Sequence, residues 1–398
     1  MEFFKKKLKN GITVLLEKRD LPLVSVSITN PFGGSYEDSK IKGIAHFIEH
    51  LVFTGTKTRS HEDISKEIEK KGGILNAYTA NEVTSFWFKL PSKHLFSGLD
   101  ILIDIMKNPK FDKNKFEKEK KVILEEIKMY KDDPQKHVFE KIEEAMFDKP
   151  FGDGIIGSEK TIKAMDRDFV YNYYQKAYNP ENYIATIVGN ADFEKVCEYL
   201  EKSFEKKGLG IQQPKIIKKN AELTEERQGI DQANFIFAVH APLMHEKNYP
   251  VLEVLDAYLA DGMSSKLFLK IREEKGLAYA VKSTINAEKN YSYYIIYVGT
   301  TKEALPEVKK IILEEFAKIE SMNENDLKEA KERVIGLLSV EKEDSARVMH
   351  ELLFSELIGK AEDYYKQEEK INSVSLNEVK KLASELLKGY STAAVVPK

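Results

Sequence analysis

Two stretches of the chain that lie about half its length apart resemble each other residue by residue. Residues 68–78 read IEKKGGILNAY and residues 271–281 read IREEKGLAYAV, which gives an offset of 271 − 68 = 203. Because the chain has 398 residues, a repeat at this spacing predicts two similar domains rather than one continuous core. We expect these domains at residues 1–212 and 213–398, with the boundary inside a polar stretch at residues 206–225.

Both halves begin with strands and continue with helices. Apolar residues alternate at residues 12–16 and again at residues 24–28, which predicts a hairpin of two neighbouring strands. In the second half, residues 233–241 and 278–298 have the composition of strands. This order predicts an α+β fold in which helices cover a mostly antiparallel, mixed sheet in each domain. Helices are predicted at residues 44–52, 62–71, 94–106, 114–131, 135–146, 196–204, 250–259 and 265–274, and further strands at residues 75–90 and 179–187.

Composition and charge exclude several classes of partner. The chain has 62 Lys and Arg against 65 Asp and Glu, so its net charge of −3 lacks the basic footprint that nucleic acids and anionic membranes attract. No run reaches the roughly 18 apolar residues of a membrane span, and no apolar signal region follows the first lysines. The single cysteine, Cys197, excludes an internal disulfide and fits a reducing compartment. We therefore expect a cytoplasmic protein that binds neither nucleic acid nor membrane.

The predicted helix at residues 44–52 contains the sequence His46-Phe-Ile-Glu-His50. Side chains four residues apart share a helix face, so both imidazoles can point at one ion while Glu49 stays beside them. This is the arrangement of the inverted zinc-protease helix. The motif therefore predicts two ligands of a metal site.

A catalytic zinc takes three protein ligands and keeps one position open, so a third ligand must come from elsewhere in the chain. The predicted helix at residues 114–131 offers four glutamates. Two of them, Glu119 and Glu126, lie seven apart and share one helix face after two turns. From the spacing alone, either carboxylate can reach the site.

Together these motifs resemble the pitrilysin, or M16, family of zinc peptidases, which includes insulin-degrading enzyme and the mitochondrial processing peptidase. Members carry His-x-x-Glu-His and, farther along, a Glu-x6-Glu helix whose second glutamate is a ligand. Here Glu126 follows His50 by 126 − 50 = 76 residues, a spacing typical of the family, and Glu119 precedes it by seven. The resemblance spans nearly the whole chain and also includes residues 33–35, 76–79, 150–157 and 272–279.

The resemblance implies a role for each residue of the motifs. His46, His50 and Glu126 are expected to hold one Zn²⁺ per chain, which activates water and polarises the scissile carbonyl. Glu49 is then the general base that takes a proton from water and passes it to the departing amine. Glu119 is expected to orient a ligand or the substrate.

Other motifs are implied to bind the substrate. Asn76 and Ala77 match family positions where the substrate adds itself as an extra strand. Arg272 and Tyr279 match a pair that reaches the substrate and steadies the developing oxyanion. At the offset of 203, the second half has Tyr249, Leu252 and Glu253 in place of the metal motif, so it is expected to bind no zinc.

Family enzymes enclose their substrate between two such two-domain halves, and a chain of 398 residues corresponds to one half of this clamshell. The resemblance therefore implies a zinc endopeptidase that cleaves peptides or unfolded segments inside a dimeric chamber. A homodimer whose partner donates Arg272 and Tyr279 is the simplest assembly. Two alternatives remain, which are the metal-bearing subunit of a heterodimeric processing protease and a non-catalytic peptide-binding or assembly subunit.

Overall fold

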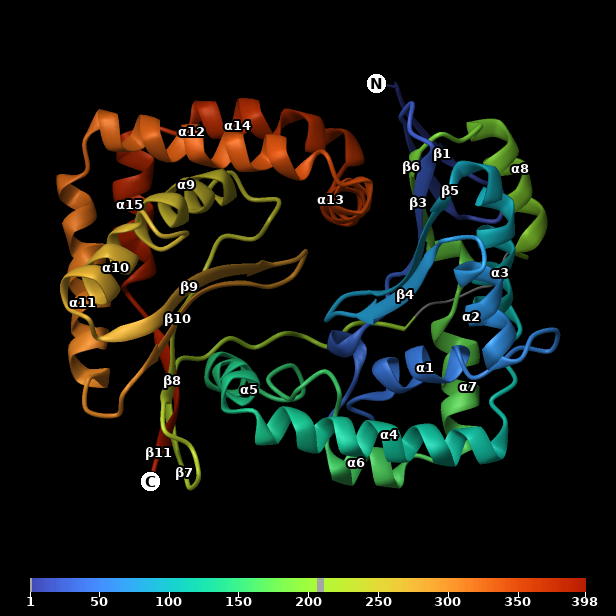
Figure 1. The fold of residues 1–398 in the computed structure, drawn as a ribbon, viewed down its shortest axis with the longest axis horizontal. Helices are drawn as coiled ribbons and strands as arrows, with labels where there is room; N and C mark the ends of the chain where they lie inside the picture. The colour runs from blue at the N-terminus through green and yellow to red at the C-terminus, as the bar shows by residue number, and fades with distance from the viewer. Residues whose placement is uncertain (1, 206–210) are drawn as a thin grey trace. The chain divides into compact units, whose positions relative to one another are not determined.

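The computed structural model describes residues 2–205 and 211–398, and these form two compact units that interleave along the sequence (Figure 1). The first unit comprises residues from 1–128, 153–215 and 341–361, and the second takes the remaining segments. The predicted boundary at residues 212 and 213 separates the repeated halves of the sequence and stays a prediction. Of the predicted polar stretch, residues 206–210 lie outside the described residues. Within the described ranges, no helix is both long and apolar enough to cross a membrane.

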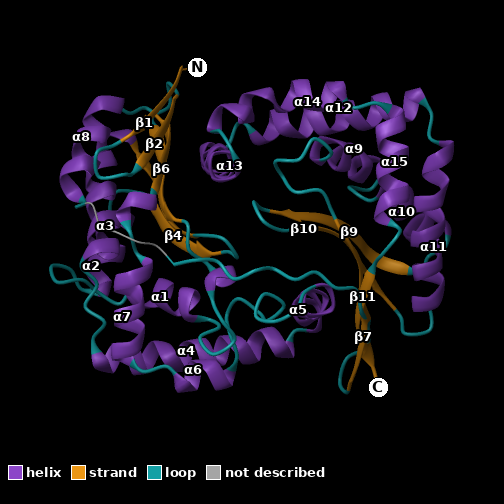
Figure 2. Ribbon diagram, turned by 180° about the vertical axis from the view of Figure 1, so that it is seen from behind, coloured by secondary structure: helices purple, strands orange, loops and turns teal. Residues whose placement is uncertain are grey.

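The sheet of the first unit has the strand order β1-β2-β6-β3-β5-β4. Figure 2 labels β1, β2, β6 and β4 of this sheet. Strands β2 and β6 pair in parallel and all other neighbours are antiparallel. The predicted hairpin is wrong, because β6 lies between β2 and β3. Every residue of β6 is buried, which suits a central strand that is covered on both faces. The strands are β1 (Glu2–Lys7), β2 (Thr13–Lys18), β3 (Leu23–Asn30), β4 (Ile74–Thr79), β5 (Thr84–Pro91) and β6 (Ile184–Gly189).

The sheet of the second unit repeats this topology without a counterpart of β1. Its order is β7-β11-β8-β10-β9, with β7 and β11 parallel and the other neighbours antiparallel. The two similar α+β domains that the sequence predicted are therefore present. Strand β7 begins inside the polar stretch predicted at residues 206–225 and ends at Arg227. Four of its six residues are charged, which gives this part of the sequence its polar character. The strands are β7 (Glu222–Arg227), β8 (Ala233–His240), β9 (Ala278–Ala287), β10 (Ser292–Thr300) and β11 (Ser391–Pro397).

Helices cover both faces of the first sheet. On β3, Val24 and Val26 point into a hydrophobic core that helices α1 and α3 complete. On the other face, Ser25 forms a buried hydrogen bond of 2.8 Å with Ser345 at the start of α13, which packs on β3 and β6. The helices of this unit are α1 (Ile44–Val52), α2 (His61–Glu69), α3 (Leu95–Lys107), most of α4 (Lys113–Asp132), α6 (Glu159–Ala164), α7 (Arg167–Ala177), α8 (Phe193–Ser203) and α13 (Ser345–Ile358).

The second sheet is covered in the same way. Phe235 and Phe237 of β8 pack in a core with helices α9, α11 and α15, whereas Ile236 and Ala238 face α5 on the other side. Helix α5 comes from the first half of the sequence and α13 from the second, so the two halves exchange the helix that covers one face. The helices here are α5 (Pro134–Met146), α9 (Tyr249–Leu259), α10 (Lys266–Phe268) with the turn η4 (Leu269–Glu274), α11 (Leu305–Ala317), α12 (Glu324–Glu341), α14 (Gln367–Ser373) and α15 (Leu376–Leu386).

Candidate metal centre

Helix α1, which carries His46 and His50, has the predicted bounds. Its N-terminus is capped by a carboxylate that lies several residues before the helix in the sequence. Glu37, which is fully buried, accepts hydrogen bonds from the backbone N–H groups of Gly43 at 3.0 Å and Ala45 at 2.7 Å. The buried Lys42 ammonium lies 3.8 Å from the same carboxylate. Burial raises the pKa of Glu37 to about 7, while Lys42 and the two N–H groups oppose the rise. A carboxylate satisfies the free N–H groups of a helix start, so Glu37 fixes α1 immediately before His46.

Sequence reasoning missed Glu37 as part of the site. A capping side chain is usually sought next to the helix start, at the residue that precedes the first helical position. Here that residue is Gly43 with φ of 95°, which has no side chain to offer. The available signal was a pair of acidic residues, Glu37 and Asp38, between the Gly33-Gly34-Ser35 motif and the helix.

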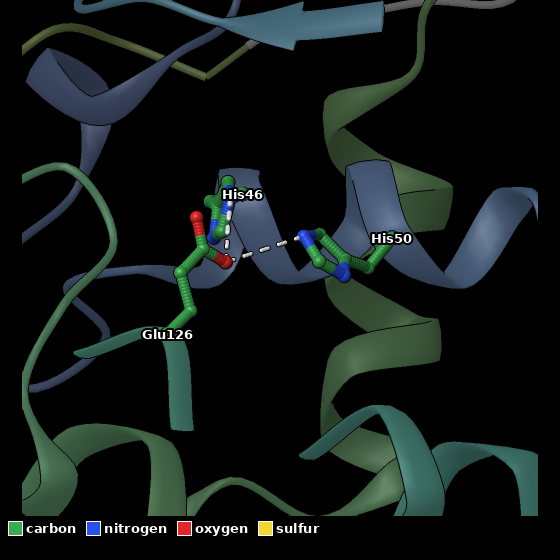
Figure 3. A group of neighbouring side chains, drawn as sticks. All are labelled: His46, His50 and Glu126. Atoms are coloured by element: carbon green, nitrogen blue, oxygen red, sulfur yellow. Dashed lines mark ion pairs between the residues drawn. The ribbon is translucent and has the colours of Figure 1, made fainter. Parts of the chain in front are cut away.

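The structure brings His46, His50 and Glu126 together (Figure 3). Both histidines project from α1 and Glu126 projects from α4. The Nε2 atoms of His46 and His50 each lie 3.7 Å from Oε2 of Glu126. One ligand atom from each of the three residues lies within 4.8 Å of the others.

This spacing fits a bound metal. Two ligands about 2.1 Å from a tetrahedral zinc are separated by roughly 3.4 Å. The observed distances of 3.7 Å are close to this value and too long for hydrogen bonds. Burial, with a smaller effect of His50, lowers the pKa of His46 to about 3. The neutral imidazole therefore has a free lone pair, as metal ligation requires.

Glu119 lies behind the second histidine. Its Oε2 is 3.4 Å from Nδ1 of His50, the ring nitrogen that faces away from Glu126. Burial lowers the pKa of His50, but the hydrogen bond with Glu119 and the charges of Glu49 and Glu126 outweigh this and raise it above its usual value. Carboxylates in this position commonly set the orientation of a ligating imidazole. Of the two glutamates that the spacing left open, Glu126 joins both histidines and Glu119 contacts one.

Glu49 lies on the same helix and points to strand β4. Its Oε2 accepts a hydrogen bond of 2.6 Å from the hydroxyl of Thr79, the last residue of β4. Burial raises the pKa of Glu49 above its ordinary value, against the effects of the Thr79 hydrogen bond and the charge of His50. A buried carboxyl group with a raised pKa beside a metal site is the environment in which general bases are found.

Asn76 and Ala77 lie on β4, which ends the strand order of the first sheet. They pair with Trp87 and Phe86 of β5, so the outer edge of β4 is left unpaired within this sheet. A pocket of about 410 Å³ lies beside the strand. It is lined by Phe53, Ser65, Ile68, Glu69, Gly73, Ile74, Leu75 and Asn76.

Arg272 and Tyr279 belong to the second unit and lie against each other. The guanidinium carbon of Arg272 is 5.4 Å from the ring centre of Tyr279 and 4.9 Å from that of Phe268. The Tyr279 side chain is 79% exposed at the start of β9. Helix α9 holds Tyr249. Among the described residues, the sole group that could hold a metal ion is His46, His50 and Glu126 in the first unit.

The chain is similar to known proteases over most of its length. Residues 13–159 match the family model "Insulinase (Peptidase family M16)", and residues 164–334 match the "Peptidase M16 inactive domain". A Bacillus subtilis (strain 168) protein named uncharacterized zinc protease YmxG is 31% identical over 400 residues, covering 98% of this chain and 97% of that protein. The uncharacterized zinc protease ML0855 of Mycobacterium leprae (strain TN) is 30% identical, covering 98% of this chain and 91% of that protein.

Solved structures share the fold. A protease from Helicobacter pylori has a TM-score of 0.93 at 20% identity, covering 100% of this chain and 99% of that one. A putative M16-like peptidase from Alicyclobacillus acidocaldarius has a TM-score of 0.86 at 18% identity, covering 100% and 98% of the two chains. The family models and the curated relatives together show that this chain belongs to peptidase family M16.

Proposed function

We propose that this chain is a zinc-dependent endopeptidase in which His46, His50 and Glu126 hold the metal. The observation that carries the proposal is the convergence of these three ligand atoms within 4.8 Å of one another. The relatives that are named zinc proteases support it. Two histidines in their neutral form and one carboxylate are a ligand set that catalytic zinc uses. Such a set leaves one position of the metal for water or substrate.

A zinc ion in this site would supply Lewis-acid chemistry for water activation and carbonyl polarisation. Glu49 would take a proton from the attacking water and transfer it to the departing amine. Its burial favours the first step, because a raised pKa makes the carboxylate a stronger proton acceptor. Glu119 would hold the His50 ring in the orientation that ligation needs.

The substrate would bind as an extended peptide along the outer edge of β4. Main-chain hydrogen bonds to a free strand edge give affinity with little dependence on sequence. The pocket of about 410 Å³ beside β4 would add one preference, because Phe53, Ile68 and Leu75 offer an apolar lining. Peptides and unfolded segments have the exposed main chain that this mode requires, whereas folded domains do not.

A second copy of the chain would complete the active site. Arg272 and the exposed Tyr279 form a donor pair without a metal of their own, and we propose that a homodimer presents this pair to the substrate of the partner. Cys197 is a free buried thiol, which fits the cytoplasmic location that we propose.

A non-catalytic assembly subunit is the alternative that has an observation in its favour. A chain of complex III2 from Candida albicans shares the fold, with a TM-score of 0.85 at 16% identity. The heterodimeric protease remains a second alternative. The intact ligand trio beside the buried Glu49 favours a peptidase over the assembly subunit.

The dependence of peptide cleavage on zinc distinguishes the peptidase from the two alternatives. A quenched fluorescent peptide of roughly 10 to 20 residues is long enough to pair along one strand. We expect the purified chain to cleave it, to lose activity with a chelator, and to regain activity when zinc is added back. An inactive chain that becomes active only with a second protein would favour the heterodimer. An inactive chain that still binds the peptide would favour the assembly subunit.

A further inference from the structure

The hydroxyl of Thr79 donates a hydrogen bond of 2.6 Å to Oε2 of Glu49. We propose that Thr79 is a positioning residue that fixes the orientation of the Glu49 carboxylate for proton transfer. This inference rests on the proposed peptidase function, and it gives a role to the last residue of the motif at residues 76–79, to which the sequence assigned none.

A glutamate needs such a partner because its last torsion angle is soft. The carboxylate plane of a free Glu rotates over a broad range, whereas proton transfer requires one oxygen to face the water at hydrogen-bond distance. With Oε2 held by Thr79, the other oxygen of Glu49 is oriented to accept the proton. Fixing this geometry before reaction removes an entropic cost from the chemical step.

The position of Thr79 is itself fixed by the loop that precedes the metal helix. The backbone N–H of Gly34 donates to the carbonyl of Ala80 at 3.0 Å. Ser35 donates to the carbonyl of Asn81 through both its backbone N–H and its hydroxyl, each at 2.7 Å. A Cβ at Gly33 would collide with the Ala80 carbonyl, so only glycine allows this close approach. The chain immediately after Thr79 is therefore anchored.

The same loop also fixes Glu49. Glu37 follows Ser35 by two residues and caps the first turn of α1, while Lys42 donates to the carbonyl of Gly34 at 2.8 Å. One short segment thus holds the end of β4 and the start of α1. The contact between Thr79 and Glu49 joins the two elements that this segment sets in place, and this gives the Gly33-Gly34-Ser35 motif a physical role.

Two substitutions of Thr79 distinguish a role in positioning Glu49 from a role in packing. Thr79→Val keeps the shape and strand propensity of threonine but removes the donor, whereas Thr79→Ser keeps the donor and removes the methyl group. We expect Thr79→Val to lower kcat by about 10- to 100-fold, with KM within about twofold and zinc content unchanged. Thr79→Ser should recover most of the wild-type kcat. Thr13→Val, the same change in strand β2, is the control and should leave kcat unchanged.

The outcomes are distinct. Full kcat in Thr79→Val, or an equal loss in Thr79→Ser, would overturn the positioning role and leave a packing role. Loss of zinc in Thr79→Val would also overturn it, because the effect would then act on the metal site. The wild type and Glu49→Gln are measured in the same assay. An inactive wild type would overturn the proposed function together with this inference, whereas an active wild type with an unaffected Thr79→Val would overturn this inference alone.

Discussion

Ser25 of β3 and Ser345 of α13 share a buried hydrogen bond of 2.8 Å although 320 residues separate them. The second unit shows the converse exchange, because Ile142 of α5 packs in one cluster with Ile236 of β8. In each unit, the helix on one face of the sheet is supplied by the other half of the sequence. The repeated halves are therefore related as sequences, and each supplies a helix to the sheet of the other.

This exchange predicts the behaviour of separated halves. Fragments of residues 1–212 and 213–398 should each fail to fold alone, because each lacks a helix that covers its sheet and each buried apolar side chain contributes about 1.5 to 3 kcal/mol. Coexpressed fragments should form a stable complex. Circular dichroism and hydrogen exchange test this directly. A cooperative unfolding transition of residues 1–212 alone would contradict it.

Substitution of Glu119 should weaken zinc binding without removing one of the three protein ligands. Replacing it with Gln weakens the hydrogen bond to His50. Substitutions of a residue that hydrogen-bonds a metal ligand typically lower metal affinity by about 10- to 100-fold. Chelator competition measures the effect. Glu125→Gln is the matched control, since Glu125 pairs with Lys128 at the surface and should not alter affinity. Equal zinc affinity in Glu119→Gln and the control would rule out the orienting role.

Subunit mixing tests whether Arg272 and Tyr279 act across a homodimer. Glu49→Gln and Arg272→Ala should each be inactive alone. Half of the dimers in an equal mixture are hybrids, and one of the two sites in a hybrid combines an intact Glu49 with an intact Arg272. We therefore expect the mixture to recover about one quarter of the wild-type activity. A mixture as inactive as its components would show that the pair does not act in trans.

His137 of α5 should make the second unit sensitive to pH. Its Nδ1 lies 3.2 Å from Glu140 and its Nε2 lies 2.9 Å from Glu225. The hydrogen bond with Glu140 and the interactions with Glu225 outweigh burial and raise the pKa of His137 above its usual value. A raised folded-state pKa contributes stability that is fully present below the unfolded value of about 6.5 and is lost as the pH rises through the folded value.

The measurement is urea unfolding of His137→Gln at about pH 5.5 and about pH 9. We expect the substitution to lower the free energy of unfolding more at the lower pH, where the wild-type histidine is charged and paired. The control is His245→Gln, whose histidine is exposed, and it should show no such difference. A loss that is the same at both pH values would contradict the linkage.

Local patterns predicted local structure well. The bounds of α1 and the convergence of His46 and His50 follow from helical periodicity, which depends only on residues a few positions apart. The third expected ligand, Glu126, was chosen through the resemblance to a family, because the spacing alone did not distinguish it from Glu119. The pairing of β2 with β6 could not be predicted, since strand order depends on contacts between residues more than 160 positions apart.

Other features of the structure cannot be recognised from periodic patterns in the sequence. The cap by Glu37 and the contact of Thr79 with Glu49 join a loop or a strand to a helix, and such contacts depend on the tertiary fold. Strand β7 was hidden by its charged residues, which give this strand at the end of the sheet a polar sequence. The exchange of α5 and α13 could not be seen from patterns that treat each half separately.

In the proposed function, Glu49 transfers a proton and is not a ligand of the zinc. The most direct test is Glu49→Gln, with zinc content and hydrolysis of the quenched peptide measured on the same preparation. We expect one zinc per chain, as in the wild type, and a rate of hydrolysis lower by at least about 100-fold. A variant that keeps its zinc and hydrolyses the peptide at the wild-type rate would contradict the account.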